Sequence, residues 1–130
     1  MVRVELACVV IHERSDEQVI LLREAEGGRE LPIVIGTFEA FAIDGTVKER
    51  SFGRPLTHDL MLTLVRRLGG EVARIVIDDL REATYYAKVV VRTGKEELLV
   101  DARPSDAITL ALKADAPIFV AERVLSATAG

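Results

Sequence analysis

The sequence contains no tryptophan, one cysteine and two histidines among 130 residues. A single cysteine excludes an intramolecular disulfide and suits a reducing compartment; Cys8 itself lies in an apolar run, which predicts a core position. Structural zinc needs three or four Cys, His or carboxylate ligands at converging positions, whereas His12 and His58 lie far apart in the sequence. The composition therefore excludes a disulfide scaffold and predicts no structural zinc site.

Long apolar runs and an excess of basic residues are also missing. The longest apolar runs, such as residues 6–11, are far shorter than the roughly 20 residues that cross a bilayer. Residues 1–6 carry charges two apart, unlike a secretory signal, so we expect a cytoplasmic protein without a membrane span. Because the net charge is -4, any nucleic-acid role requires a local basic patch.

What is present is β-rich sequence in two sets of three segments. The first set covers residues 2–12, 19–22 and 31–35, and the second covers residues 72–80, 85–91 and 98–101. Helical sequence follows each set, and residues 117–120 predict a last strand. We therefore expect an α+β domain of two three-strand meanders, each followed by helix.

Three segments have the periodicity of helices. Residues 37–44 offer Thr37 as N-cap and place Phe38, Phe41 and Ala42 on one face. Residues 55–68 have helically spaced apolar positions and stop at two glycines, and residues 104–114 begin with proline.

The repeated order predicts one domain over residues 1–125, arising by internal duplication, with halves of about 1–70 and 71–125. Residues 126–130 are small and predict a flexible tail. Strands 31–35 and 89–91 would promote aggregation if they were open edges, so we expect a homo-oligomer, with a symmetric dimer as the first expectation.

The most informative feature is an Arg-Pro phrase that occurs twice. Arg54-Pro55-Leu56-Thr57-His58-Asp59 and Arg103-Pro104-Ser105-Asp106 each follow β-rich sequence and open a helical stretch. Proline is favoured as the first helical residue, and helix N-termini bind anions readily. The two phrases are therefore the predicted site.

The residues of the phrases suit phosphodiester chemistry. Arg54 and Arg103 can hold phosphate oxygens, and His58 can act as a general acid or base. The hydroxyls of Thr57 and Ser105 are further candidate substrate contacts at the helix N-termini.

Carboxylates complete the candidate site. Asp59 and Asp106 can orient His58 or bind a metal, and Glu39 and Asp101 are further candidates. These four side chains could hold a divalent cation such as magnesium or manganese, although their convergence cannot be read from the sequence.

Each assignment has a structural alternative. Asp106 at the third helical position, and Asp59 at the second if Thr57 is the N-cap, would stabilise the helix dipole without any ligand. The arginines could pair with these carboxylates or with Asp101, and His58 could be an ordinary boundary histidine.

The phrases belong to a larger pattern that closely resembles the bifunctional nuclease domain family. Its parts are Leu31-Pro32-Ile33-Val34-Ile35-Gly36 with Glu39-Ala40, the first Arg-Pro phrase, Tyr85-Tyr86-Ala87, Asp101-Ala102 with the second Arg-Pro phrase and Ala107, and Ala116-Pro117-Ile118-Phe119-Val120. The resemblance runs from residue 2 to residue 125 and implies a nuclease acting on RNA and DNA.

Composition favours a second function class, a non-enzymatic module that binds an anionic ligand or a protein partner. RNA or single-stranded DNA would need exposed aromatics among basic residues, and the only adjacent aromatic pair is Tyr85-Tyr86. Both functions predict the same Arg-Pro site.

Overall fold

The computed structural model describes residues 1–128, which form an α+β domain. The strands are β1 (Val2–Val10), β2 (Glu17–Glu24), β3 (Glu30–Gly36), β4 (Gly70–Arg81), β5 (Thr84–Thr93), β6 (Glu96–Ala102) and β7 (Ile118–Val120). The helices are α1 (Thr37–Val47), α2 (Thr57–Arg67), α3 (Pro104–Ala114) and α4 (Glu122–Thr128). The predicted fold class is therefore confirmed.

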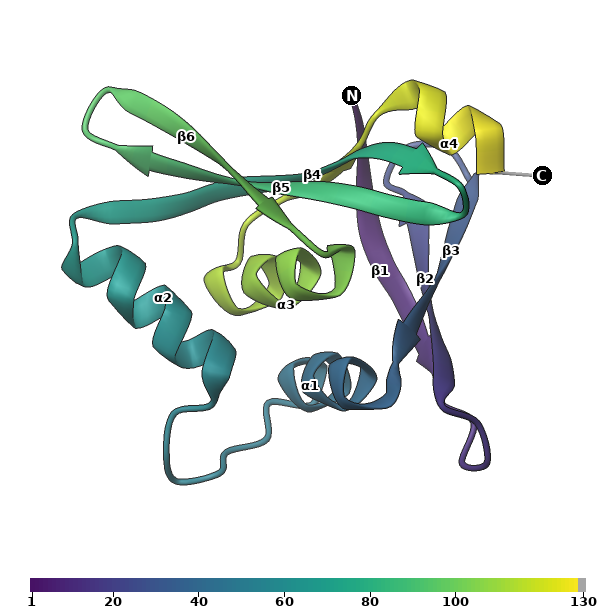
Figure 1. Ribbon diagram of the computed structural model, residues 1–130, viewed down its shortest axis with the longest axis horizontal. Helices are drawn as coiled ribbons and strands as arrows, with labels where there is room; N and C mark the ends of the chain where they lie inside the picture. Colours follow the sequence, from purple (N-terminus) through teal and green to yellow (C-terminus); the bar gives the residue numbers. More distant parts are fainter. Residues whose placement is uncertain (129–130) are drawn as a thin grey trace.

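The strands form one continuous sheet in the order β3-β2-β1-β7-β4-β5-β6. Strands β1 to β3 and β4 to β6 are two antiparallel meanders, and β7 joins them by pairing antiparallel with β1 and parallel with β4. In Figure 1 the meanders lie across each other, with α1 and α3 in the angle between them. Three strands followed by a helix occur twice, as predicted, but duplication itself stays a prediction.

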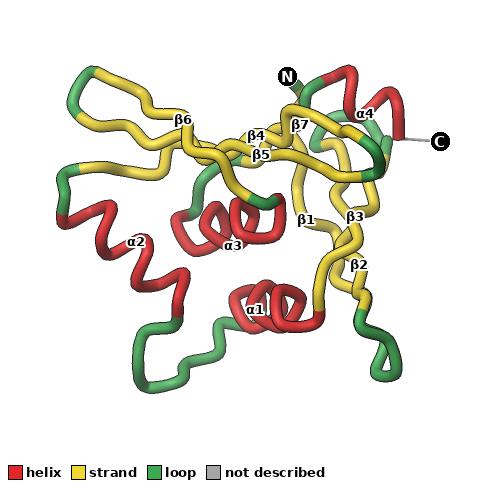
Figure 2. The backbone as a smooth tube through the Cα atoms, in the orientation of Figure 1, coloured by secondary structure: helices red, strands yellow, loops and turns green. Residues whose placement is uncertain are grey.

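The core lies where α1 and α3 pack against the sheet. Helix α3 is buried along most of its length because alanines such as Ala107 and Ala111, with no exposed surface, allow close approach. Helix α1 contributes Ala40 and Ile43, also fully buried. The tube view of Figure 2 shows both helices in red, below β4 to β6 and beside β1 to β3. The N-terminus of α3 is part of this packing, because Pro104 and Ser105 are buried.

Two expectations for the strands were wrong: the burial of Cys8 and an open edge at residues 89–91. Cys8 is exposed, because a bulge between Leu6 and Cys8 interrupts the alternation of β1. Residues 89–91 lie within β5. This strand pairs with β4 on one side and β6 on the other, so it is an interior strand of the sheet. The sheet edges are β3, as predicted for residues 31–35, and β6.

The first helix differs from its prediction in cap and face. Gly36, not Thr37, is the N-cap of α1, and the Thr37 hydroxyl instead accepts a hydrogen bond from Gln18 Nε2 at 3.3 Å. The face with Phe38 and Phe41 is exposed, because the opposite face, with Ala40 and Ile43, meets the core.

The predicted tail was wrong for residues 126–128, which end α4. Val124 and Leu125 are buried and anchor this helix to the sheet, a contact that the small residues after them do not reveal. Residues 129–130 lie outside the described residues. Among residues 1–128, no helix is long and apolar enough to cross a bilayer.

Candidate functional site

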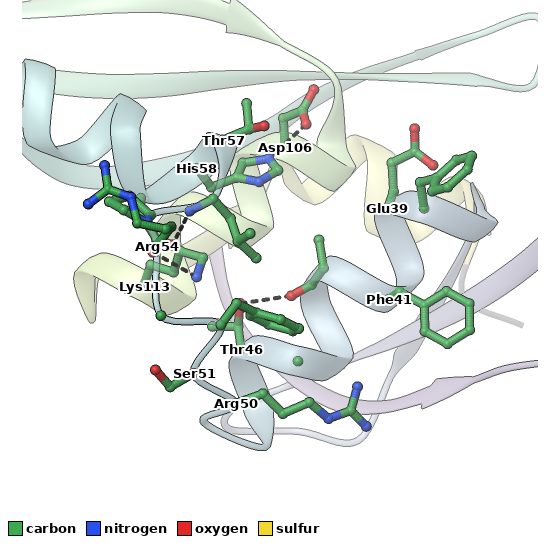
Figure 3. Close-up of a pocket in the computed structure, with 18 of the residues that line it drawn as sticks. Glu39, Phe41, Thr46, Arg50, Ser51, Arg54, Thr57, His58, Asp106 and Lys113 are labelled. Carbon is green, nitrogen blue, oxygen red and sulfur yellow. Dashed lines mark hydrogen bonds and ion pairs between the residues drawn. The ribbon is translucent and has the colours of Figure 1, made fainter.

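The two Arg-Pro phrases meet in space. The N-termini of α2 and α3 lie side by side, and His58 Nε2 is 2.9 Å from Asp106 Oδ1 although the residues are 48 positions apart. Both phrases line one open cleft of about 1000 Å³, together with α1 and the loop before α2. Figure 3 shows His58 directed at Asp106 within this cleft.

The N-terminus of α2 is capped by Asp59 and not by Thr57. Leu56 is the N-cap, so Asp59 occupies the third helical position, and its Oδ2 accepts a hydrogen bond from the Leu56 N–H at 2.9 Å. The predicted cap at Thr57 was wrong, because the helix already begins at Thr57. Thr57 is exposed and lines the cleft.

Helix α3 begins as predicted, with Arg103 as N-cap, Pro104 as the first helical residue and Asp106 as the third. The Arg103 Nε donates to Asp106 Oδ2 at 2.9 Å. Burial raises the pKa of Asp106, but the hydrogen bonds from Arg103 and His58 outweigh it, and the net shift of the pKa is downward. Asp106 is therefore a carboxylate at neutral pH.

The charge on Asp106 determines the tautomer of His58. Because an ionised carboxylate only accepts hydrogen bonds, the Nε2 of His58 must carry the proton of the contact with Asp106. A neutral His58 then has its free electron pair on Nδ1. The side chain of His58 is 14% exposed, so it is held in place and still reached from the cleft.

Arg103 links α1 to the same cluster. Its Nη1 donates to Glu39 Oε1 at 3.0 Å while its Nε is held by Asp106, and these two hydrogen bonds raise the pKa of the guanidinium. The structural alternative for this arginine, an ion pair with Asp106, is therefore present. Glu39, a further candidate, is brought into the site by the same contact.

Lys113 was missed by the sequence analysis. Its Nζ lies 2.9 Å from Asp59 Oδ1, and this contact, together with the N–H of Leu56, lowers the pKa of Asp59. The sequence did carry a signal, because Lys113 follows Asp106 by seven residues and so shares its face of α3.

Two candidates lie outside the cleft. Asp101 has a side chain that is 78% exposed on the edge strand β6, where its Oδ1 is 3.5 Å from Lys88 Nζ. Ser105 is buried and lines a neighbouring groove beside β3, which its position one residue after Pro104 does not reveal.

Positive charge exceeds negative charge in the cleft. Four cationic side chains line it, namely Arg50, Arg54, Arg103 and Lys113, against the acidic side chains of Glu39, Asp59 and Asp106. Arg50, also missed from sequence, bonds Asp44 at 3.1 Å. Three of the four cations are held in ion pairs, which leaves Arg54 as the cationic side chain of the cleft with no ion pair among the described residues.

The carboxylates do not fit a divalent cation as they stand. Arg103 forms ion pairs with both Glu39 and Asp106, and Lys113 forms an ion pair with Asp59. Each carboxylate therefore already has a cationic partner. Within residues 1–128, no group of three His, Cys, Asp or Glu side chains has metal-binding geometry. A cation at these residues would have to displace a guanidinium or an ammonium group.

Two adjacent helix N-termini, an oriented imidazole and several guanidinium groups therefore face one open cleft. This combination defines an α+β domain suited to an anionic ligand that is held beside a proton-transfer group.

Comparison with known proteins identifies the family of the chain. The profile of the bifunctional nuclease domain matches residues 20–129, and the chain belongs to this family. The uncharacterized proteins MT1877 and Rv1829, from two strains of Mycobacterium tuberculosis, are each 40% identical over 126 residues, 97% of this chain and 75% of theirs. The resemblance inferred from the motifs is confirmed.

Plant relatives are more distant. Bifunctional nuclease 2 of Oryza sativa subsp. japonica is 26% identical over 114 residues, 85% of this chain and 35% of the rice protein. The bifunctional nuclease of Oryza minuta is 24% identical over 118 residues, 88% of this chain and 36% of that protein. The chain spans about a third of these plant proteins.

Proposed function

We propose that this protein hydrolyses phosphodiester bonds of RNA and DNA in the cleft between α1, α2 and α3. The observation that carries the proposal is the meeting of His58, from the start of α2, with Arg103 and Asp106, from the start of α3. Asp106 is within hydrogen-bond distance of both other side chains. The names of the rice relatives agree with it.

Two arginines are placed to hold the phosphate. Arg54 is exposed in the cleft and has no ion pair among the described residues, so it is free to bind an oxyanion. Arg103 uses Nε and Nη1 for Asp106 and Glu39, which leaves its Nη2 available to a phosphate oxygen. Donors directed at the phosphoryl oxygens stabilise the charge that develops there as the water attacks.

His58 is the proposed general base. Its Nδ1 takes a proton from the attacking water while its Nε2–H remains bonded to Asp106, whose negative charge stabilises the imidazolium that forms. As the oxygen of the water bonds to phosphorus, the bond from phosphorus to the leaving oxygen breaks, and the leaving oxygen takes a proton from solvent. Attack by water needs no ribose hydroxyl, so the same arrangement serves both RNA and DNA. In this proposal Asp106 is a positioning residue and His58 the catalytic one.

The test is hydrolysis of labelled single-stranded RNA and DNA, with and without EDTA. His58→Ala should lower the rate by about 100- to 10,000-fold, the usual contribution of a general acid or base. His12→Ala is the matched control, because His12 is exposed and lies outside the cleft. Arg103→Ala should also lose activity, and circular dichroism must show that each variant is folded.

Equal rates in His58→Ala and the wild-type protein would contradict the proposal and point to a contaminating nuclease. Loss of activity in EDTA would show that a divalent cation, such as magnesium or manganese, takes part after rearrangement of the ion pairs.

A non-enzymatic module that binds an anionic ligand is the second candidate. It is favoured by one observation: Arg103 and Lys113 already neutralise the carboxylates of the cleft, a stable arrangement that needs no catalysis. Retention of an oligonucleotide without cleavage by the wild-type protein would support this candidate over hydrolysis.

We also propose that the chain forms a homo-oligomer through β6. This edge strand exposes Leu98, Leu99 and Val100 in succession. The opposite edge, β3, contains Pro32, which has no N–H to donate to an added strand. The β6 edge is therefore better suited to pairing with a second copy.

A further inference from the structure

Three of the four phenylalanines of the chain are exposed around the cleft. Phe38 is 88% exposed, Phe41 50% and Phe52 58%, and all three line the cleft beside the Arg-Pro phrases. Exposed apolar side chains are normal when scattered, whereas aromatics gathered around one basic cleft mark a binding surface.

The aromatic side chains come from two segments that lie together. Phe38 and Phe41 are on the exposed face of α1, and Phe52 comes from the loop between α1 and α2. The Phe52 ring lies over Gly45 of α1, where an added Cβ would be 4.0 Å from Cε2 of the ring. The loop therefore holds the Phe52 ring beside α1, near Phe41 of the same helix.

Arginines line the same cleft as these rings. In the view of Figure 3, Phe41 and Arg54 lie on opposite sides of the cleft, with Glu39 and His58 between them, and Arg50 lies along the lower rim. A chain of nucleotides crossing from Arg54 to Phe41 would therefore pass His58. Guanidinium groups would meet its phosphates and aromatic rings would meet its bases.

We propose that Phe38, Phe41 and Phe52 are a stacking platform for the unpaired bases of single-stranded RNA or DNA. The inference rests on the proposed function in placing the scissile phosphate at His58. Single-strand binding combines a positively charged groove with aromatic rings, because every base has a face that can stack whatever its sequence. A duplex keeps its bases paired and stacked internally, so it could use the arginines but not the rings.

The charge of the cleft favours this occupant over a protein. The chain carries a net charge of -4, yet four cationic side chains line the cleft against three acidic ones, and Arg54 among them has no ion pair within the described residues. A strand of nucleotides is complementary to this charge and to the aromatic rings at once.

The test is the affinity for a fluorescent single strand of about 12 nucleotides, which is within the length that single-strand sites occupy. Anisotropy is measured in the His58→Ala background so that the strand is not cleaved. Phe38→Ala, Phe41→Ala and Phe52→Ala should each weaken binding by about 5- to 100-fold, the usual effect of losing one stacked base. Phe52→Trp should retain affinity, because a larger ring still stacks.

Two controls separate stacking from charge and from general loss of apolar surface. Leu68→Ala, at a residue that is 84% exposed at the far end of α2, should bind like the parent. An abasic strand of the same length should bind the parent more weakly than any single phenylalanine variant binds the normal strand, and the phenylalanine substitutions should not weaken its binding further.

Equal affinity of the phenylalanine variants and the parent would overturn the platform while leaving hydrolysis at His58 intact. Conversely, phenylalanine-dependent binding by a protein that cleaves nothing would uphold the platform and overturn the proposed hydrolysis. If the substitutions change sedimentation of the protein alone and leave oligonucleotide affinity unchanged, the rings are a protein interface and the inference is wrong.

Discussion

Asp59 and Asp106 occupy the same third position of their helices but differ in their partners. Asp59 accepts a hydrogen bond from the N–H of Leu56 and so caps its helix. This is a structural role that needs no ligand. Asp106 instead uses Oδ1 for His58 and Oδ2 for Arg103, both of them side chains. Stabilisation of the helix dipole alone does not require these two contacts, so Asp106 is the carboxylate that belongs to the proposed chemistry.

The ion pair of Lys113 with Asp59 gives a prediction at this scale. Lys113→Met should lower the free energy of unfolding by up to about 1 kcal/mol at neutral pH, since the Asp59 side chain is 40% exposed and partly screened. The pKa of Asp59 is lowered from 3.8, so its ionised form stabilises the fold above that value, and this stability is lost as the pH falls through the folded pKa.

The difference between wild-type protein and Lys113→Met should therefore shrink below pH 3.8, which urea unfolding at several pH values would measure. Asp59→Asn supplies the other arm of a double-mutant cycle. A difference that persists at the lowest pH would assign the effect to packing of the lysine stem and not to the ion pair.

At the scale of the elements, Gly45 lowers the stability of helix α1. This glycine has ordinary helical backbone, and the nearest atom that a Cβ would meet is Phe52 Cε2 at 4.0 Å, an ordinary contact. Gly45→Ala should therefore raise the free energy of unfolding by about 0.5–1 kcal/mol, because alanine is favoured over glycine within helices. Thermal or urea unfolding measures the change.

Gly53→Ala is the matched control, because Gly53 has a φ of 78° in open surroundings. Alanine there should cost about 1 kcal/mol through the left-handed backbone. The prediction for α1 would be wrong if Gly45→Ala were the more destabilising of the two.

The elements show how far the sequence determines the site. Helical spacing located α2 and α3, and the Arg-Pro phrases predicted their N-termini and hence most of the cleft. Periodicity finds an apolar face of a helix but not whether another element covers it, which is why the exposure of Phe38 was not foreseen. Likewise, equally apolar strands at residues 31–35 and 89–91 are an edge and an interior strand, a difference decided by long-range pairing.

At the scale of the whole molecule, the exposed β6 edge predicts association. Leu99→Lys, at a residue that is 67% exposed, should shift the protein toward monomer, because a charge on an edge strand opposes pairing with another strand. Sedimentation velocity over a range of concentrations would show the change. Val34→Lys, 57% exposed on β3, is the control and should leave association unchanged.

Monomeric wild-type protein at all concentrations would contradict association through β6. Loss of association in Val34→Lys alone would assign the contact to β3.

The sheet can close during folding only after the three residues of β7 have been synthesised. They are the link between the meanders in the described sheet, and they pair with residues 2–4 on one side and 75–77 on the other. Each meander can form from neighbouring hairpins as it leaves the ribosome, but the centre of the sheet needs nearly the whole chain. The fold thus combines fast local steps with a late closure between distant segments, the kind of contact that slows folding.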